Sequence, residues 1–560
     1  MKLYPGSGWL SSFFLFIFSA IFITTEVCAK APPDRTMQEH VQQIFNKLVD
    51  ARGDRSVKRP ALFWTTEAGN GAFFEPGTNR ITFEEKTYGV CQSFGENTDN
   101  AIAYVLAHEV IHYYKNHGWE AAFAKKFADQ AVARDVKETI TDIKQQETEA
   151  DLLGGFLAFT AGYNTVGIAK EFLPKLYETF GWPKENPKYP TLDERILVAE
   201  TTEKELTNLI QMFETANLLV AVQRFEDAID LYEHILSVYK SRELVNNLGV
   251  VYCLEAINEC DYSEIRFAYP LELDGEARLR LGSKNVSGLG TNIPKRDSLL
   301  RAGAENFMEA MQLDREYHTA RLNLGAAYAL LGLLYDKVDQ EESDMSYALA
   351  DVYARSAIRR TSKDKNRKLE ADAWALLGII AANKNNKKEA TEFFKKGEKN
   401  SPLAKNNLMV LERGDILQKV EKKPRGLDRE EIEAFSLDDF LRANPKVDQV
   451  IEVKGKKVRR QWAYKTTEFK QSKLLVNRVG KDNYVFFHIT QPGYNGKTLE
   501  DIGLGALRDE IITKYKTPDK EIQLPKGHLL WYAADEIIFW LDEDQKLERW
   551  CVYRLKPEPK

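Results

Sequence analysis

WALLGIIAANKNNKKEATEFFKKGEKNSP, from Trp374 to Pro402, places small and large apolar residues at fixed helical spacings. The positions that carry the pattern are Trp374, Leu377, Gly378, Ala381, Ala390, Phe394, Gly397 and Pro402. Small residues let the two helices of a hairpin approach each other, and large ones fill the space between hairpins. We therefore predict a helix-turn-helix unit that buries its apolar face only when similar units are stacked on it.

These eight positions resemble a tetratricopeptide repeat, a helix-turn-helix unit of about 34 residues. Weaker copies of the pattern precede it: Phe225, Ala228, Tyr232 and Ile235; Leu248, Gly249 and Tyr252; Gly303, Phe307 and Ala310; Leu324, Gly325, Tyr328 and Gly332; Ala350, Ala354 and Ala357. We expect tetratricopeptide-like helical repeats over residues 204–415, with an insertion near 261–298. The alternative is a generic helical bundle without a repeat.

The composition is that of an ordinary globular protein with several domains. The chain has 560 residues, of which 43% are hydrophobic and 29% charged, and this length is too great for one core. A formal net charge of −6 gives no basic surface, so we expect no nucleic acid partner.

The first residues have the pattern of a secretory signal peptide. Lys2 precedes an apolar stretch over residues 9–24, and Val27-Cys28-Ala29 forms a small-residue cleavage site. We expect a signal peptide over residues 1–29, cleaved after Ala29, and export of the chain. A lipid on Cys28 and an uncleaved anchor are the alternatives, although the stretch is short for a membrane span.

Four cysteines remain in the expected mature chain, namely Cys91, Cys253, Cys260 and Cys551. They are too few for a disulfide scaffold. Cys253 and Cys260 can pair if a helix breaks between them, and separate buried thiols are the alternative.

Two further regions flank the expected repeats. In residues 30–203, GAFFEPGTNRITFEE predicts two short strands around a turn, and KETITDIKQQETEADLLGGFLAFTAG predicts a long helix. A charged linker over 416–435 leads to strand-like segments and one helical stretch, residues 498–515, which predict an α+β domain over 436–560. The expected fold class is mainly α, with an α+β domain at each end.

The stretch AHEVIHYYKNH, residues 107–117, carries candidate metal ligands. His108 and His112 are four apart and share one helix face, so both can bind one metal ion. Glu109 is rotated by about 100° and can reach a water on that metal without binding it. Helical histidines satisfied by packing are the alternative.

A second helix supplies carboxylates 35 residues after His112, in ETEAD. Glu147 and Asp151 are four apart, so one can bind the metal and the other can accept the free N–H of a ligand histidine. A catalytic zinc ion has three protein ligands and an open position, which predicts one Zn²⁺ per chain. A solvated helix face is the alternative for Glu147.

HEVIH, ETEAD and LLGGFLAFTAGY together resemble the HExxH, ExxAD and Ala-Gly-Tyr series of the M48 family of zinc metallopeptidases, over about residues 60–200. The resemblance implies a zincin-like domain with zinc ligands His108, His112 and Glu147, the general base Glu109, and Asp151 as an outer carboxylate serving His108. YPTLDERI resembles a later family segment, in which Arg195 matches an arginine of the active-site wall or oxyanion site. Tyr189 stands where that segment has a histidine, and its hydroxyl is a candidate oxyanion donor.

With the repeats, the resemblance implies the periplasmic branch of the family. The expected function is an exported metalloendopeptidase in envelope protein quality control, peripherally associated with the membrane or free. Its substrates would be unfolded or misassembled envelope proteins, recruited with other protein partners through the repeats. The alternative is a repeat-based chaperone or scaffold with a gated or rarely active protease centre.

Overall fold

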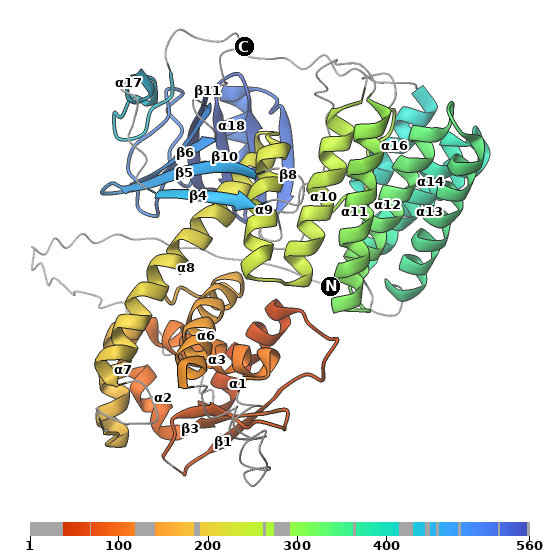
Figure 1. Cartoon of the computed structure of the whole chain (residues 1–560). Coiled ribbons are helices and arrows are strands. Elements are labelled where there is room, and N and C mark those ends of the chain that lie inside the picture. The colour runs from red at the N-terminus through yellow and green to blue at the C-terminus, as the bar shows by residue number, and fades with distance from the viewer. Residues whose placement is uncertain are drawn as a thin grey trace, which may run out of the picture.

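The computed structural model shows a mainly helical chain with two separate β-sheets (Figure 1). It describes residues 37–67, 69–117, 140–183, 191–260, 265–273, 292–361, 366–413, 429–442, 449–454, 459–479, 483–524 and 527–556. The expected signal peptide and Tyr189 lie outside these residues. Within them, no helix combines the length and the apolar character that crossing a membrane requires.

The N-terminal part packs a small sheet against helices. Its elements are α1 (Met37–Arg52), β1 (Ala61–Thr65), β2 (Ala72–Phe74), β3 (Arg80–Glu84), α2 (Glu85–Gln92), the 3₁₀ turn η1 (Gly95–Asn97), α3 (Thr98–Lys115), α6 (Ile140–Thr160) and α7 (Ile168–Phe180). α1 ends just before Gly53, which adopts a φ of +65°, a conformation that residues with a side chain rarely adopt.

The strand pair expected around the turn is present as β2 and β3, which pair antiparallel with Phe74 opposite Ile81. A further strand, β1, pairs with β3 in parallel and gives the order β1-β3-β2. The sequence did not predict β1, because only five residues pair and they do not alternate cleanly between buried and exposed. Within this sheet β2 is therefore an edge strand.

A single long helix, α8 (Leu192–Ala221), connects the N-terminal part to the rest. It starts at a capping box formed by Thr191 and Glu194, and no glycine or proline interrupts its 30 residues. The domain boundary expected at residues 203/204 falls inside this helix. In Figure 1, α8 runs from the helices of the N-terminal part to the second sheet.

The helical hairpins expected from the sequence are present. The helices are α9 (Phe225–Val238), α10 (Arg242–Asn258), α11 (Ile293–Leu313), α12 (His318–Tyr335), α13 (Gln340–Thr361), α14 (Arg367–Asn383), α15 (Lys387–Gly397) and α16 (Pro402–Arg413). They pack as successive pairs, α8 with α9 through to α14 with α15, and α16 closes the array. At Gly378, a Cβ atom would lie 2.5 Å from the ring of Phe394, which explains the small and large positions of the motif.

Part of the expected insertion is well defined. Residues 265–273 are neither helix nor strand, and they lie among the helices of the array with their apolar side chains buried. Residues 261–264 and 274–291 of the insertion lie outside the described part of the chain.

The C-terminal part is an eight-stranded antiparallel sheet of order β4-β5-β6-β7-β11-β10-β9-β8. The elements are α17 (Leu437–Arg442), β4 (Gln449–Lys454), β5 (Arg459–Glu468), β6 (Ser472–Val479), β7 (Asn483–Thr490), α18 (Arg508–Tyr515), β8 (Lys520–Leu524), β9 (Gly527–Tyr532), β10 (Ile537–Leu541) and β11 (Leu547–Lys556). One face packs on the helical part of the molecule, where Lys473 pairs with Glu214 of α8 at 2.7 Å.

Two expectations for the C-terminal part need correction. The helix expected over residues 498–515 begins only at Arg508, because the preceding residues form turns and Gly505 has a φ of +86°. The expected linker is structured from residue 429 onward: Ile432 is fully buried, and Arg429 pairs with Glu536 at 2.8 Å. These residues therefore belong to the C-terminal part.

The cysteines that the structure describes are all free and buried. α10 continues without a break to Asn258, so it carries Cys253 in its interior. Of the two alternatives for Cys253 and Cys260, the structure has the separate thiols.

Candidate metal centre

The candidate metal centre lies where α3 and α6 cross at close range. Gly154 of α6 faces the backbone of α3, and a Cβ atom there would lie 3.0 Å from the amide nitrogen of His108. Because backbone atoms cannot move aside as a side chain can, this position needs glycine to keep the two helices at this separation. Because a glycine carries no functional group, the sequence alone does not reveal this role.

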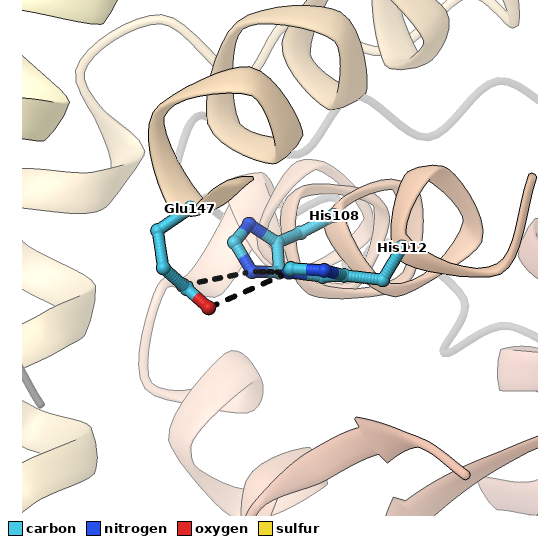
Figure 2. Close-up of side chains that lie close together, drawn as sticks. All are labelled: His108, His112 and Glu147. Atoms are coloured by element: carbon cyan, nitrogen blue, oxygen red, sulfur yellow. Dashed lines mark hydrogen bonds and ion pairs between the residues drawn. The ribbon is translucent and has the colours of Figure 1, made fainter. Parts of the chain in front are cut away.

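Two histidines and a carboxylate converge at this crossing (Figure 2). The two Nε2 atoms of His108 and His112 are 3.0 Å apart. The carboxylate oxygens of Glu147 lie 3.4 Å from His108 Nε2 and 3.6 Å from His112 Nε2. The structure thus brings together the three residues expected to bind a metal, and all three are partly accessible, with 12, 13 and 22% of the side chain exposed.

The spacing of these donor atoms fits a zinc ion. Zinc–nitrogen bonds of about 2.0–2.1 Å in a tetrahedral site put ligand atoms about 3.3 Å apart. The other nitrogen of each ring is already bound: His108 Nδ1 lies 2.8 Å from Asp151 Oδ1, and His112 Nδ1 lies 3.0 Å from His117 Nδ1. Both Nε2 atoms are therefore directed at one shared point, where a cation could be bound by them together with Glu147.

The pKa values of the candidate ligands follow from burial and from their charged neighbours. Burial opposes protonation of His108, but the carboxylates of Asp151 and Glu147 outweigh it and raise its pKa to about 10. Burial and the charge of His108 lower the pKa of His112 to about 3. Burial opposes ionisation of Glu147, yet Arg195 and the histidines lower its pKa. Without a metal, the site therefore holds a protonated His108 between two carboxylates and a neutral His112, so a cation would bind by displacing the His108 proton.

Glu109 lies beside the three donors but is held by the sheet. The main-chain N–H of Phe74 in β2 donates to Glu109 Oε2 at 2.8 Å. Glu75 N donates to Arg80 O of β3, so its neighbour Phe74 directs its N–H to the free edge of β2. Burial raises the pKa of Glu109 to about 7, with His108 opposing the shift. A carboxylate with this pKa can take and return a proton near neutral pH.

Arg195, near the start of α8, contacts two carboxylates of α6, those of Glu147 and Asp151. It donates a hydrogen bond to Glu147, and its Nη2 lies 3.7 Å from Asp151 Oδ1. The structure therefore places Arg195 at the wall of the site, paired with a candidate metal ligand. This pairing provides charge compensation for two buried carboxylates.

A chain of hydrogen bonds behind His112 was not assigned from the sequence. His117 Nε2 lies 3.1 Å from Glu149 Oε2, and Lys115 Nζ lies 2.5 Å from Glu149 Oε1. Because a carboxylate only accepts, His117 donates from Nε2 and accepts at Nδ1 from His112. Burial lowers the pKa of His117, which is consistent with this neutral tautomer. The sequence signal was present, since Glu149 is the middle residue of ETEAD and His117 ends AHEVIHYYKNH.

Comparison with known proteins adds no family to this description. No protein-family model and no curated protein matches the chain. The assignment of the centre therefore depends on its own residues: two imidazoles, three carboxylates and an arginine, gathered from three helices beside the edge of a sheet.

Proposed function

We propose that this chain is an exported, periplasmic zinc metalloendopeptidase that hydrolyses peptide bonds in unfolded or misassembled envelope proteins. The observation that carries the proposal is the convergence of His108, His112 and Glu147, with Glu109 beside them. In this proposal the N-terminal part is a zincin-like domain of the M48 type. The helical array is a tetratricopeptide-like solenoid that recruits substrates or partner proteins, and residues 1–29 direct export.

The residues present fit zinc, which His108, His112 and Glu147 would hold. A zinc ion in such a site would act as a Lewis acid on the peptide carbonyl. It would also lower the pKa of water, so that a hydroxide nucleophile forms near neutral pH. Asp151 fixes the tautomer of His108, and His117 fixes that of His112, so that each ring presents Nε2 to the metal.

Glu109 has the position and the pKa of a general base. It would take a proton from the attacking water and pass it to the leaving amine. Its hydrogen bond from Phe74 holds the carboxylate at the free edge of β2. Glu109 is thus oriented without using the groups that bind the metal.

The edge of β2 is the proposed place for the substrate backbone. An extended peptide can pair with an edge strand through its main chain, which tolerates many side-chain sequences. Such pairing would place the scissile bond beside Glu109, because the edge and the carboxylate are already in contact through Phe74. Broad tolerance suits substrates that are recognised because they are unfolded.

Arg195 is proposed to compensate the charge of Glu147 and Asp151 and to form the wall of the site. Its contacts with both carboxylates support this role more directly than a role in oxyanion binding. Tyr189 remains a proposed oxyanion donor on the basis of the sequence pattern.

The decisive experiment compares Glu109→Gln with wild type in the cleavage of reduced casein at pH 7.5 with equimolar zinc. We expect kcat to fall by about 10²–10⁴-fold, the usual contribution of a general base, while zinc content stays at one per chain. Glu96→Gln, which changes an exposed carboxylate, is the matched control and should retain full activity. Equal inactivity of wild type and Glu109→Gln, with partner binding intact, would favour a chaperone or scaffold instead.

A further inference from the structure

Residues 265–273, IRFAYPLEL, lie against one side of the helical array in the manner of a bound peptide. The side chains of Ile265, Phe267, Tyr269, Leu271 and Leu273 are all buried, none being more than 6% exposed. The polar contacts of the segment come from α10, α12, α14 and α16, which are the alternate helices of the array. We call this side of the array the asparagine face, after Asn246, Asn323, Asn383 and Asn407, one on each helix.

Two of these asparagines bind the main chain of the segment at both polar groups of one residue. Asn407 accepts from Ala268 N at 3.0 Å and donates to Ala268 O at 2.8 Å. Asn323 accepts from Glu272 N at 2.9 Å and donates to Glu272 O at 2.8 Å. A primary amide matched in this way to a peptide unit recognises an extended backbone whatever the side chains are.

Asn246 also donates to Glu272 O, at 3.1 Å, and two further contacts are made to side chains of the segment. Asn383 donates to the hydroxyl of Tyr269 at 3.1 Å, and Lys368 forms an ion pair with the carboxylate of Glu272. The ring of Phe267 lies 5.9 Å from that of Phe394, centroid to centroid. The face thus favours a peptide with apolar or aromatic side chains at alternate positions and a carboxylate toward its C-terminal end.

The hairpin that carries the segment does not need it in order to close. α10 and α11 meet at two glycines, where a Cβ atom on Gly249 would lie 3.0 Å from Gly303 O and 2.7 Å from the ring of Phe307. This contact is made by the helices themselves. The segment leaves after α10, crosses to α16 and returns, so it is an addition to a hairpin that is already packed.

We propose that the asparagine face is a binding site for an extended partner peptide of this chemistry, and that residues 265–273 are its built-in competitor. The partner peptide would bind by displacing the segment, so binding is weak until a partner supplies a better match. A tethered ligand has an effective concentration of about a millimolar. A free peptide of equal affinity must therefore be present at a similar concentration in order to displace the segment. The inference does not depend on the metal centre or on peptidase activity.

The test uses the full chain and a fluorescein-labelled synthetic peptide, IRFAYPLEL, with binding followed by fluorescence anisotropy. Tyr269→Ala combined with Leu271→Ala weakens the built-in segment without touching the face. We expect this double variant to bind the peptide at least about tenfold more tightly than wild type. Adding Asn323→Ala and Asn407→Ala should remove the gain, because these two amides hold the backbone.

A control peptide of the same sequence, N-methylated at its alanine and its glutamate, keeps every side chain but lacks the two N–H groups that donate to Asn407 and Asn323. We expect it to bind the double variant at least about tenfold more weakly than IRFAYPLEL. Equal binding of the two peptides, or no binding by a double variant that keeps its helical circular dichroism, would overturn the proposal. Dimerisation of wild type by exchange of the segment, seen by light scattering, would overturn it as well, because the occupant would then be a second copy.

Hydrogen exchange on wild type gives an answer even if the double variant does not fold. We expect the amides of Ala268 and Glu272 to exchange faster than those in the interior of α12, as they must if the segment leaves while the helices stay folded. Protection equal to that of α12 would make the segment a fixed part of the core and would overturn the proposal.

Discussion

The metal centre and the asparagine face both gather side chains from neighbouring helices, but they do so with opposite chemistry. At the metal centre, ionisable groups from α3, α6 and α8 meet at one point, and each candidate ligand has its own partner. On the asparagine face, neutral amides on four helices form hydrogen bonds with residues spread along one extended segment.

This difference follows from the cost of burying each kind of group. A buried charge without a partner is far more costly than a buried amide without one, so the metal centre has to be compact and fully compensated. A neutral amide contributes about 1 kcal/mol per hydrogen bond and can be repeated along a surface without mutual repulsion. We therefore expect a single substitution to abolish metal binding at the metal centre. A single substitution on the asparagine face should only weaken its contacts with the segment.

The largest effect should come from Glu147→Ala, which removes a candidate metal ligand and the carboxylate that accepts a hydrogen bond from Arg195. We expect zinc affinity, measured by competition with a chromophoric chelator, to fall by more than about 100-fold, since even loss of an outer partner costs 10–100-fold. Gln145→Ala, at an exposed position on the same helix, is the control. Unchanged zinc affinity in Glu147→Ala would remove this residue from the site.

His117→Ala should have the next largest effect, because it removes the partner that fixes the tautomer of His112. We expect zinc affinity to fall by about 10–100-fold and the visible spectrum of the cobalt-substituted protein to change. His117→Asn, whose amide oxygen can accept the same proton, should restore part of both. If the cobalt spectrum is the same in all three proteins, His117 does not position the ligand.

Asn323→Ala tests the contribution of one amide of the asparagine face to stability. It removes both hydrogen bonds to Glu272 and one, of 2.8 Å, to Asn246, and it leaves buried groups without partners. We expect urea unfolding of the helical array to lose about 1–3 kcal/mol, with zinc content unchanged. Asn383→Ala, which removes one bond to a hydroxyl, should cost less. A loss of zinc in Asn323→Ala would show that the two sites are coupled.

The smallest expected effect separates two adjacent glycines of α6. A Cβ on Gly154 would meet the backbone of α3, whereas one on Gly155 would meet the methyl groups of Leu206, 2.4 Å from the nearer one. We expect Gly154→Ala to cost about 1 kcal/mol in stability and several-fold in zinc affinity, because the helices must separate. Gly155→Ala should leave zinc affinity unchanged, since the end of a leucine side chain can move. Equal zinc affinities in the two variants would mean that the helix separation does not control the centre.

Local spacing predicted much of this molecule. Four-residue intervals placed His108 with His112, and Glu147 with Asp151, on common helix faces, and the 3.6-residue period of a helix is enough for that. Small and large residues at repeat positions predicted the hairpins, because a small residue indicates where two helices pack closely and a large one fills the space beside it. The strand pair around the turn before α2 followed from its turn residues.

Other features depended on contacts between distant segments. β1 is too short and irregular to be recognised before its parallel partner β3 is known. The boundary expected at 203/204 falls within α8 because a change in residue texture does not break a helix that has neither glycine nor proline to stop it. Turns around Gly505 likewise shortened the expected helix before Arg508.

The sequence by itself determined which groups could bind a metal and which helices would form hairpins, because both depend on intervals of a few residues. Only the tertiary structure decided that Arg195 pairs with Glu147, that His117 supports His112, and that residues 265–273 return to the asparagine face. Those contacts join residues up to 139 positions apart, and their energy comes from burial and charge compensation that exist only after the helices have packed.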